Sequence, residues 1–233
     1  MRLLALDTAT ELCSAALFVD GAITVREAWA PREHAALILP MIEELLRERQ
    51  LEGSALDAVA FGRGPGAFTG VRLATAVAQG LGYAWGKPLI PISDLAALAA
   101  RALQEEGTVT RALVCQDARM VEVYWASFER SERTGRRLLQ CSDEVVSGPD
   151  RVMLPESWQR EPLPVVGAGS GFETYGALRD RLAARLHALR PAVRPHAREV
   201  AVLAAEQGLS VAVPPAQAQP VYLRDRVTSP SSN

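Results

Sequence analysis

The sequence predicts an α/β protein of two lobes, each built from a mixed sheet with flanking helices. Three observations support this prediction. Each half of the chain has the same coarse order, in which hairpin strands come first and a strand and a helix follow. Apolar segments with strand-like and helix-like spacing alternate along the sequence. With 233 residues, of which 48% are hydrophobic, the chain is long enough for one large or two small cores.

The first lobe is expected over residues 1–105. Asp20-Gly21 reads as a hairpin turn between two strands. Leu37, Met41 and neighbouring apolar residues form a broad stripe at helical spacing, and Pro40 should kink that helix or mark a second start. The predicted strands are 2–6, 13–19, 22–29, 57–61 and 87–92, and the predicted helices are 32–49, a helix from the glycine turn to 85, and 94–103.

The second lobe is expected over residues 106–233. Its helix 196–207 carries Ala and Val on one face, and we allow for its packing back on the first lobe. A proline-rich linker is expected over 213–219 and a disordered tail over 229–233. The predicted strands are 112–116, 121–128, 136–141 and 164–166, the other predicted helix is 175–189, and 155–164 is expected to be irregular.

Composition excludes several functional classes. The net charge is −2 and the pI is about 6.0, which argues against a surface that grips a nucleic-acid backbone by itself. Cys13, Cys115 and Cys141 are too few and too scattered for a disulfide framework or a zinc site, and they indicate reduced thiols in a cytoplasmic protein. The sequence shows neither a signal peptide nor an apolar run long enough to span a membrane.

The stretch 62–72 is rich in glycine and joins a short apolar strand to a helix. Thr69 is the expected N-cap of that helix. Free backbone N–H groups in such a turn could bind an anion, and the absence of side chains could equally let two backbones pack closely. The turn alone does not choose between these functions.

The order of elements resembles the actin-like (ribonuclease H-like, ASKHA) fold of sugar kinases and Hsp70-type ATPases. Within that fold, the chain is similar over essentially its whole length to the TsaB family, also called YeaZ. Segment 64–72 (GPGAFTGVR) is the specific signal, and the supporting matches are His34 and segments 5–9 (ALDTA), 39–42 (LPMI), 91–98 (PISDLAAL), 117–119 (DAR), 122–124 (EVY) and 221–224 (VYLR).

The resemblance implies a non-catalytic platform in the machinery that makes threonylcarbamoyladenosine beside the tRNA anticodon. It implies a TsaD-type catalytic partner, a TsaE-type ATPase, contact with tRNA only through the complex, and either a homodimer or a monomer when the chain is alone. TsaD holds its metal with a His-x-x-x-His pair. The matching positions here are Asp94 and Leu98, and leucine cannot bind a metal, so no metal or cofactor is expected.

Three residues are candidates for contact with a nucleotide. Asp7 lies where actin-like ATPases place an acid near the metal ion of the nucleotide, although general turn chemistry favours an Asx turn that satisfies the chain leaving the strand. Gly167 and Gly169 belong to a glycine run that could touch an adenosine or could only form a strand-to-helix turn. A second phosphate loop would fall at 115–119, where glycine is missing.

The partner interface is expected on the two helices of the first lobe. Small residues recur every four positions and form one face, which is usually an internal packing face. With the family resemblance, we expect this face to be exposed and to pair with TsaD or a second copy as a four-helix bundle. The expected interface residues are Leu37, Met41, Gly70, Val71, Ala74, Thr75 and Ala78.

Two other functions compete with the scaffold. An actin-like small-molecule kinase or ATPase is the main alternative, although the missing second glycine loop and the short chain argue against it. A metallopeptidase is contradicted by three scattered histidines with no His-Glu-x-x-His motif. Arg133, Arg136 and Arg137 could contact tRNA or could be ordinary solvated surface, and the net charge favours the latter.

Overall fold

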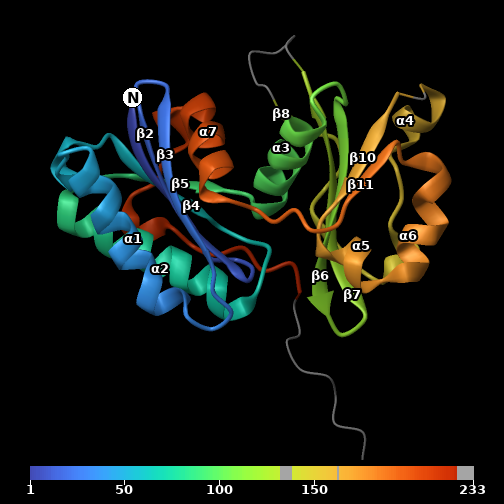
Figure 1. Ribbon diagram of the computed structural model, residues 1–233, viewed down its shortest axis with the longest axis horizontal. Coiled ribbons are helices and arrows are strands. Elements are labelled where there is room, and N and C mark those ends of the chain that lie inside the picture. Colours follow the sequence, from blue (N-terminus) through green and yellow to red (C-terminus); the bar gives the residue numbers. More distant parts are fainter. Residues whose placement is uncertain (132–137, 162, 225–233) are drawn as a thin grey trace, which may run out of the picture.

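The computed structural model describes residues 1–131, 138–161 and 163–224. Within them, two sheets and their helices form two lobes side by side (Figure 1). The predicted two-lobed α/β architecture is therefore confirmed. The arginine-rich turn at Arg133, Arg136 and Arg137 and the expected disordered tail 229–233 lie outside the described residues.

The first sheet has the strand order β3-β2-β1-β4-β5. Its strands are β1 (Arg2–Asp7), β2 (Leu12–Val19), β3 (Ala22–Trp29), β4 (Ala58–Gly62) and β5 (Leu89–Ile92). β2 is antiparallel to both of its neighbours, β1 and β3, whereas β4 is parallel to β1 and β5 is parallel to β4. β1 is buried on both faces, which explains why its sequence is a continuous apolar run without alternation.

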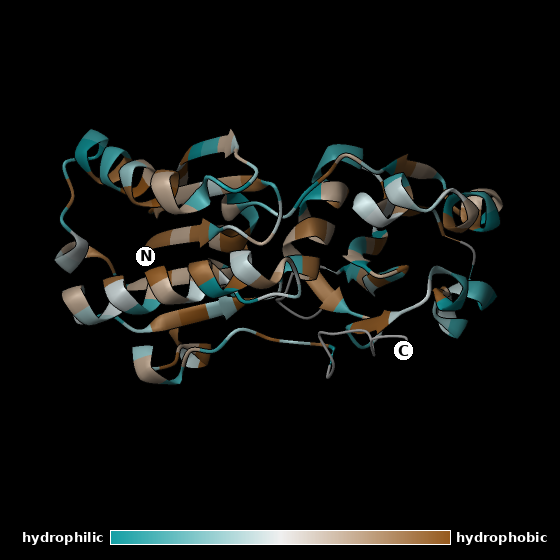
Figure 2. Cartoon of the chain, turned by 90° about the horizontal axis from the view of Figure 1, so that it is seen from below, coloured by the Kyte–Doolittle hydropathy of each residue, from teal (hydrophilic) through white to brown (hydrophobic). Residues whose placement is uncertain are grey.

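Helices cover both faces of the first sheet. On one face, α1 (His34–Glu48) and α2 (Phe68–Trp85) enclose a core that includes Leu4, Leu6 and Phe61. On the other face, α7 (Ala197–Gln207) packs against β1, β2 and β4. Figure 2 shows that the strands are mostly hydrophobic and that the helices carry both hydrophobic and hydrophilic residues.

The second sheet has the strand order β11-β10-β6-β7-β8, and β9 also pairs with β7. Its strands are β6 (Arg111–Arg119), β7 (Glu122–Arg130), β8 (Leu138–Gln140), β9 (Val145–Ser147), β10 (Val165–Ala168) and β11 (Ala188–Arg190). α3 (Asp94–Glu106) covers one face, and α4 (Glu156–Arg160), α5 (Ser170–Thr174) and α6 (Gly176–Leu182) lie on the other side.

The two lobes exchange helices. α3 follows β5 of the first sheet but packs on β6, β7 and β10 of the second, although residues 1–105 were expected to form the first lobe. α7 follows β11 of the second sheet and packs back on the first, and α3 and α7 contact each other between the sheets (Figure 1). The chain therefore crosses the junction between lobes twice through packed helices.

Several local expectations are corrected. α2 begins at Phe68 with Ala67 at its N-cap, and Thr69 lies inside the first turn with no capping role. α1 continues through Pro40, whose side chain faces solvent. Segment 155–164 contains the short helix α4, because Trp158 is buried in the second core.

The helix expected over 175–189 ends at Leu182. Its expected last residues belong instead to β11, which pairs in parallel with β10. Backbone hydrogen bonds to that neighbouring strand outweigh the weak local preference for helix, which periodicity alone could not reveal.

Candidate functional site

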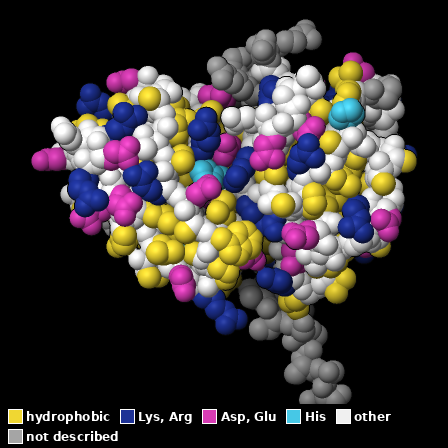
Figure 3. Space-filling model, viewed as in Figure 1, with side chains coloured by type: hydrophobic (Ala, Val, Ile, Leu, Met, Phe, Trp, Pro, Cys, Tyr) yellow, Lys and Arg dark blue, Asp and Glu magenta, His cyan; other side chains and the backbone are white. Residues whose placement is uncertain are grey.

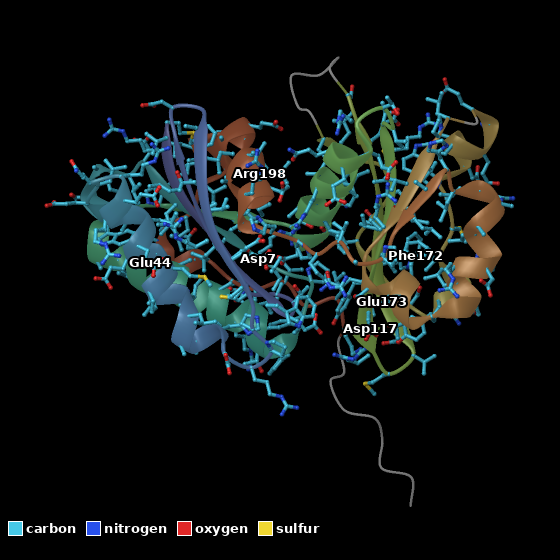
Figure 4. The ribbon with its side chains drawn as sticks, viewed as in Figure 1. Asp7, Glu44, Asp117, Phe172, Glu173 and Arg198 are labelled. Atoms are coloured by element: carbon cyan, nitrogen blue, oxygen red, sulfur yellow. The ribbon has the colours of Figure 1, made fainter. Side chains whose placement is uncertain are left out.

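A cleft of ≈ 520 Å³ lies between the lobes. The first lobe contributes the turn Ala9–Glu11 and the approach to α2, 66–68. The second lobe contributes the tip of the β6–β7 hairpin, part of α5 and Arg194, and the C-terminal segment 221–224 closes one side. Figure 4 shows Asp7 at the end of β1, with Asp117 and Glu173 across from it on the second lobe.

Charged side chains in the cleft are already paired with one another. Arg194 donates to Glu173 over 2.8 Å, and Arg119 lies 3.2 Å from Asp117 and 3.7 Å from Glu11. Arg224 pairs with Glu122 at the hairpin. Because each arginine has an acidic neighbour, the described part of the cleft lacks the concentrated positive field that binds a polyphosphate.

Two buried polar atoms that line the cleft make no hydrogen bond within the described chain. They are Gln116 Oε1, an acceptor, and Arg194 Nε, a donor. Tyr175 OH donates to Asp117 Oδ1 over 2.9 Å, and the Asp117 N–H donates to Ser170 Oγ over 3.0 Å. Burial, followed by this carboxylate, raises the pKa of Tyr175 to about 12. The hairpin is thus held to the second lobe by its own hydrogen bonds.

None of the three nucleotide candidates lines the cleft. A Cβ on Gly167 would lie 2.7 Å from Leu186 and 2.8 Å from Leu189, so this glycine serves close packing inside the second core. Gly169 has φ +104° and leaves no room for a Cβ beside the Cys115 carbonyl. Asp7 is fully buried, and its Oδ1 accepts the Ala9 N–H over 2.9 Å in an Asx turn.

Asp94 lies beside Asp7 at the start of α3 and is also fully buried. Its Oδ2 accepts the Gly64 N–H. Burial, and then the nearby charge of Asp7, raise the pKa of Asp94 well above its ordinary value. The glycine turn therefore encloses a pair of carboxyl groups on its inner side.

The small-residue face of α2 is not where the sequence analysis placed it. Gly70, Val71, Ala74, Thr75 and Ala78 are buried in the described chain, where α2 packs against the sheet. The expectation that this face is exposed is corrected. A four-residue repeat identifies a close-packed face, but it does not say whether a sheet or a partner helix packs there.

The outward surface of α1 and α2 differs from the buried small-residue face. On α2, its residues lie two positions after the buried ones. Its exposed small residues recur at Ala76, Gly80 and Ala84, and Leu39 and Tyr83 are exposed beside them. Leu37 and Met41 are half-buried on α1. Figure 3 shows hydrophobic side chains gathered over the lower part of this lobe, where α1 and α2 lie. We call this surface, defined by Leu37, Leu39, Met41, Ala76, Gly80, Tyr83 and Ala84, the α1–α2 face.

Two of the three histidines lie at helix starts. His34 Nε2 lies 2.8 Å from the Thr10 carbonyl oxygen at the start of α1, and His196 Nδ1 accepts the Arg198 N–H at the start of α7. Among the described residues, no group of three or more His, Cys, Asp or Glu side chains is arranged to hold a metal ion. In the same residues, no helix has the length and apolar character needed to cross a bilayer.

Comparison with known proteins extends the resemblance over the whole chain. A family model described as "TsaD: tRNA N6-adenosine threonylcarbamoyltransferase" matches residues 27–229. The Escherichia coli "tRNA threonylcarbamoyladenosine biosynthesis protein TsaB" is 36% identical over 230 residues, which cover 97% of this chain and 96% of that protein. This chain belongs to the TsaB family. The solved structure "YeaZ from Pseudomonas aeruginosa" superposes with a TM-score of 0.84 at 40% identity, covering 95% of this chain and 99% of that one.

Membership in the TsaB family agrees with the two-lobed actin-like fold and the recognised motifs. No cleft role was predicted for Arg194 or Tyr124, which line the cleft, and Tyr124 was noted only as part of a family motif. Segment 221–224 was likewise noted only as a family motif, whereas the structure shows Tyr222 OH accepting from Arg72 Nε over 2.7 Å and Arg224 reaching the hairpin. Only folding brings these distant segments together, so local spacing gave no signal for them.

Proposed function

We propose that this chain is a non-catalytic scaffold subunit in tRNA threonylcarbamoyladenosine biosynthesis. It pairs with a TsaD-type catalytic subunit and keeps it competent to transfer threonylcarbamoyl from its adenylate to the adenosine beside the anticodon. A TsaE-type ATPase joins the complex, which works in the cytoplasm, and tRNA meets this chain only through that complex. The names of the relatives and of the matching family model support the pathway.

The observation that carries the proposal is the open space at Gly80. A Cβ on Gly80 would meet no atom within 4 Å, so the folded chain itself has no steric need for glycine there. Glycine inside a helix costs about 1 kcal/mol relative to alanine. A partner helix crossing at roughly 8–10 Å would need that space. From Leu73 to Trp85, α2 also contains no Asp, Glu, Lys or Arg, which favours an apolar contact.

The α1–α2 face therefore replaces the buried small-residue face as the proposed contact surface. Leu37 and Met41 remain in the proposed interface, now with Ala76, Gly80 and Ala84 from α2. When the catalytic subunit is absent, a second copy of this chain pairs through the same surface. The arginines of the cleft pair with neighbouring carboxylates, and the buried Asp7 carboxylate accepts a backbone N–H. Both features support a subunit that does not hydrolyse ATP by itself.

The test places a long charged side chain on the proposed contact surface. Gly80→Arg is compared with Ala184→Arg, because Ala184 is also exposed but lies on the second lobe. We expect Gly80→Arg to melt normally and to weaken binding to the TsaD-type subunit at least a hundredfold, about 2.7 kcal/mol. Ala184→Arg should bind as the wild type does. A normally folded Gly80→Arg protein with full binding would contradict the proposal.

The alternative, an actin-like kinase or ATPase, makes a different prediction. Isothermal titration calorimetry of the isolated chain with Mg-ATP, together with a phosphate-release assay, distinguishes the two functions. A scaffold should neither turn over ATP nor modify tRNA alone. ATP turnover that is lost in Asp7→Ala would establish the enzyme instead, provided that the variant melts as the wild type does.

A further inference from the structure

Two buried carboxyl groups meet beneath the glycine turn that leads into α2. Asp7 ends β1, Asp94 begins α3, and both side chains are fully buried. Gly62 lies between them. A Cβ there would collide with Asp94 Oδ1 and would lie 2.9 Å from Asp7 Oδ2. Those two oxygens therefore point toward the same small space beside Gly62.

Each carboxyl group uses one oxygen for the backbone. Asp7 Oδ1 accepts the Ala9 N–H, and Asp94 Oδ2 accepts the Gly64 N–H. The other oxygens, Asp7 Oδ2 and Asp94 Oδ1, are buried and have no donor within the described chain. If both groups were ionised, two like charges would face each other without water, which is strongly unfavourable. One proton between them would remove the repulsion and satisfy both oxygens.

We propose that Asp7 and Asp94 share a single proton, carried on Asp94 Oδ1 and donated to Asp7 Oδ2. The pair fixes the glycine turn from inside, because each partner also holds one backbone N–H beside it. Burial, and then the charge of Asp7, raise the pKa of Asp94, which agrees with a proton on Asp94. The site is independent of whether the chain binds a partner.

Other ionisable groups around the pair do not replace the shared proton. Arg63 favours the ionised form of Asp94, but its guanidinium pairs with Glu144 over 3.2 Å. Asp7 contributes to raising the pKa of the Cys13 thiol to about 11, after burial, so the thiol stays protonated at neutral pH. His196 feels the charge of Asp7, but burial lowers its pKa and favours a neutral ring.

The key variant is Asp94→Asn. Its amide N–H can donate to Asp7 Oδ2 and its carbonyl oxygen can accept from Gly64, so asparagine copies the protonated acid without a titrating group. The parent for this comparison is the Glu199→Gln protein, and the test variant carries Glu199→Gln together with Asp94→Asn. Glu199 is replaced in both because it is a second buried acid with a raised pKa. Urea unfolding is then followed between pH 5 and pH 8.

Relative to Asp94→Asn, the parent should lose stability as the pH rises. One proton taken up on folding lowers the folding equilibrium constant about tenfold per pH unit while the native pair stays protonated and the unfolded pair is ionised. Parallel stability profiles for the two proteins would overturn the proposal. The proposal would also be overturned if added Mg²⁺ stabilised the parent but not Asp94→Asn, because a cation would then occupy the site.

Infrared spectroscopy gives an answer even if Asp94→Asn fails to fold. The Glu199→Gln parent at pH 8 should show the carbonyl band of one buried protonated carboxylic acid, shifted in deuterated buffer. Absence of that band in the folded parent would contradict the shared proton. Where Asp94→Asn does fold, the band should be missing from its spectrum.

Discussion

Thr8 and Gly70 join the end of β1 to the first turn of α2. Thr8 Oγ1 donates a 2.7 Å hydrogen bond to the Gly70 carbonyl oxygen, although 62 residues separate them in sequence. Gly70 also faces the Thr8 carbonyl so closely that a Cβ would overlap it. The recognised glycine motif therefore serves direct contact between a helix and a strand, one of the two functions that the sequence left open.

Gly70→Ala should destabilise the protein, because its new methyl group would collide with backbone that cannot move aside easily. Overpacking typically costs about 1–3 kcal/mol. Gly80→Ala is the matched control, since its methyl group meets open space, and it should stabilise the helix by about 0.5–1 kcal/mol. Urea unfolding measures both, and equal effects of the two substitutions would contradict the packing argument.

Ala74→Arg should prevent normal folding of the isolated chain. Ala74 is fully buried where α2 packs on the sheet, so an arginine there would bury an unpaired charge at a cost of several kcal/mol. Thermal melting and circular dichroism of the purified variant test this. A native melt would show that the inner side of α2 can open to water, and it would restore the original expectation of an exposed face.

Glu199→Gln should change how stability depends on pH. Burial raises the pKa of Glu199 from its ordinary value of 4.5 to about 7. Because the pKa of Glu199 is higher in the folded state than in the unfolded state, protonated Glu199 contributes to the stability of the fold. This contribution is fully present below about pH 4.5 and is lost as the pH rises through about 7. The loss is roughly 3 kcal/mol at 1.36 kcal/mol per unit. Urea unfolding at pH 5 and pH 8 should show a smaller difference for Glu199→Gln, and an unchanged difference would refute the assignment.

Glu144→Ala should destabilise the contact between lobes. The Glu144 side chain is only 7% exposed, pairs with Arg63 over 3.2 Å and accepts a hydrogen bond from Ser93. Removing one partner of a buried polar cluster costs about 1–3 kcal/mol. Glu156→Ala is the control, because its pair with Arg160 is largely exposed and should contribute less than about 1 kcal/mol. Similar losses in the two variants would count against a structural role for Glu144.

Local spacing was sufficient for much of the fold. Hairpin turns, most buried strands, the three helices of the first half and the helix over 196–207 were predicted because their hydrophobic periods and turn residues are encoded within short windows. The prediction of a helix over 175–189 was wrong where β11 forms, because hydrogen bonds to a strand distant in sequence determine the conformation of that segment. The sequence also identified α2 as a close-packing helix.

The sequence by itself determined the family, the two-lobed architecture and the residues worth examining, including Asp7 and the glycine turn. Only the tertiary structure decided which way those residues face. It turned Ala74 toward the sheet and left Gly80 open, and it placed Asp94 against Asp7 across 87 positions of sequence. The physical reason is that burial and the pairing of charges depend on which distant segments share a surface, and a local repeat carries no information about that.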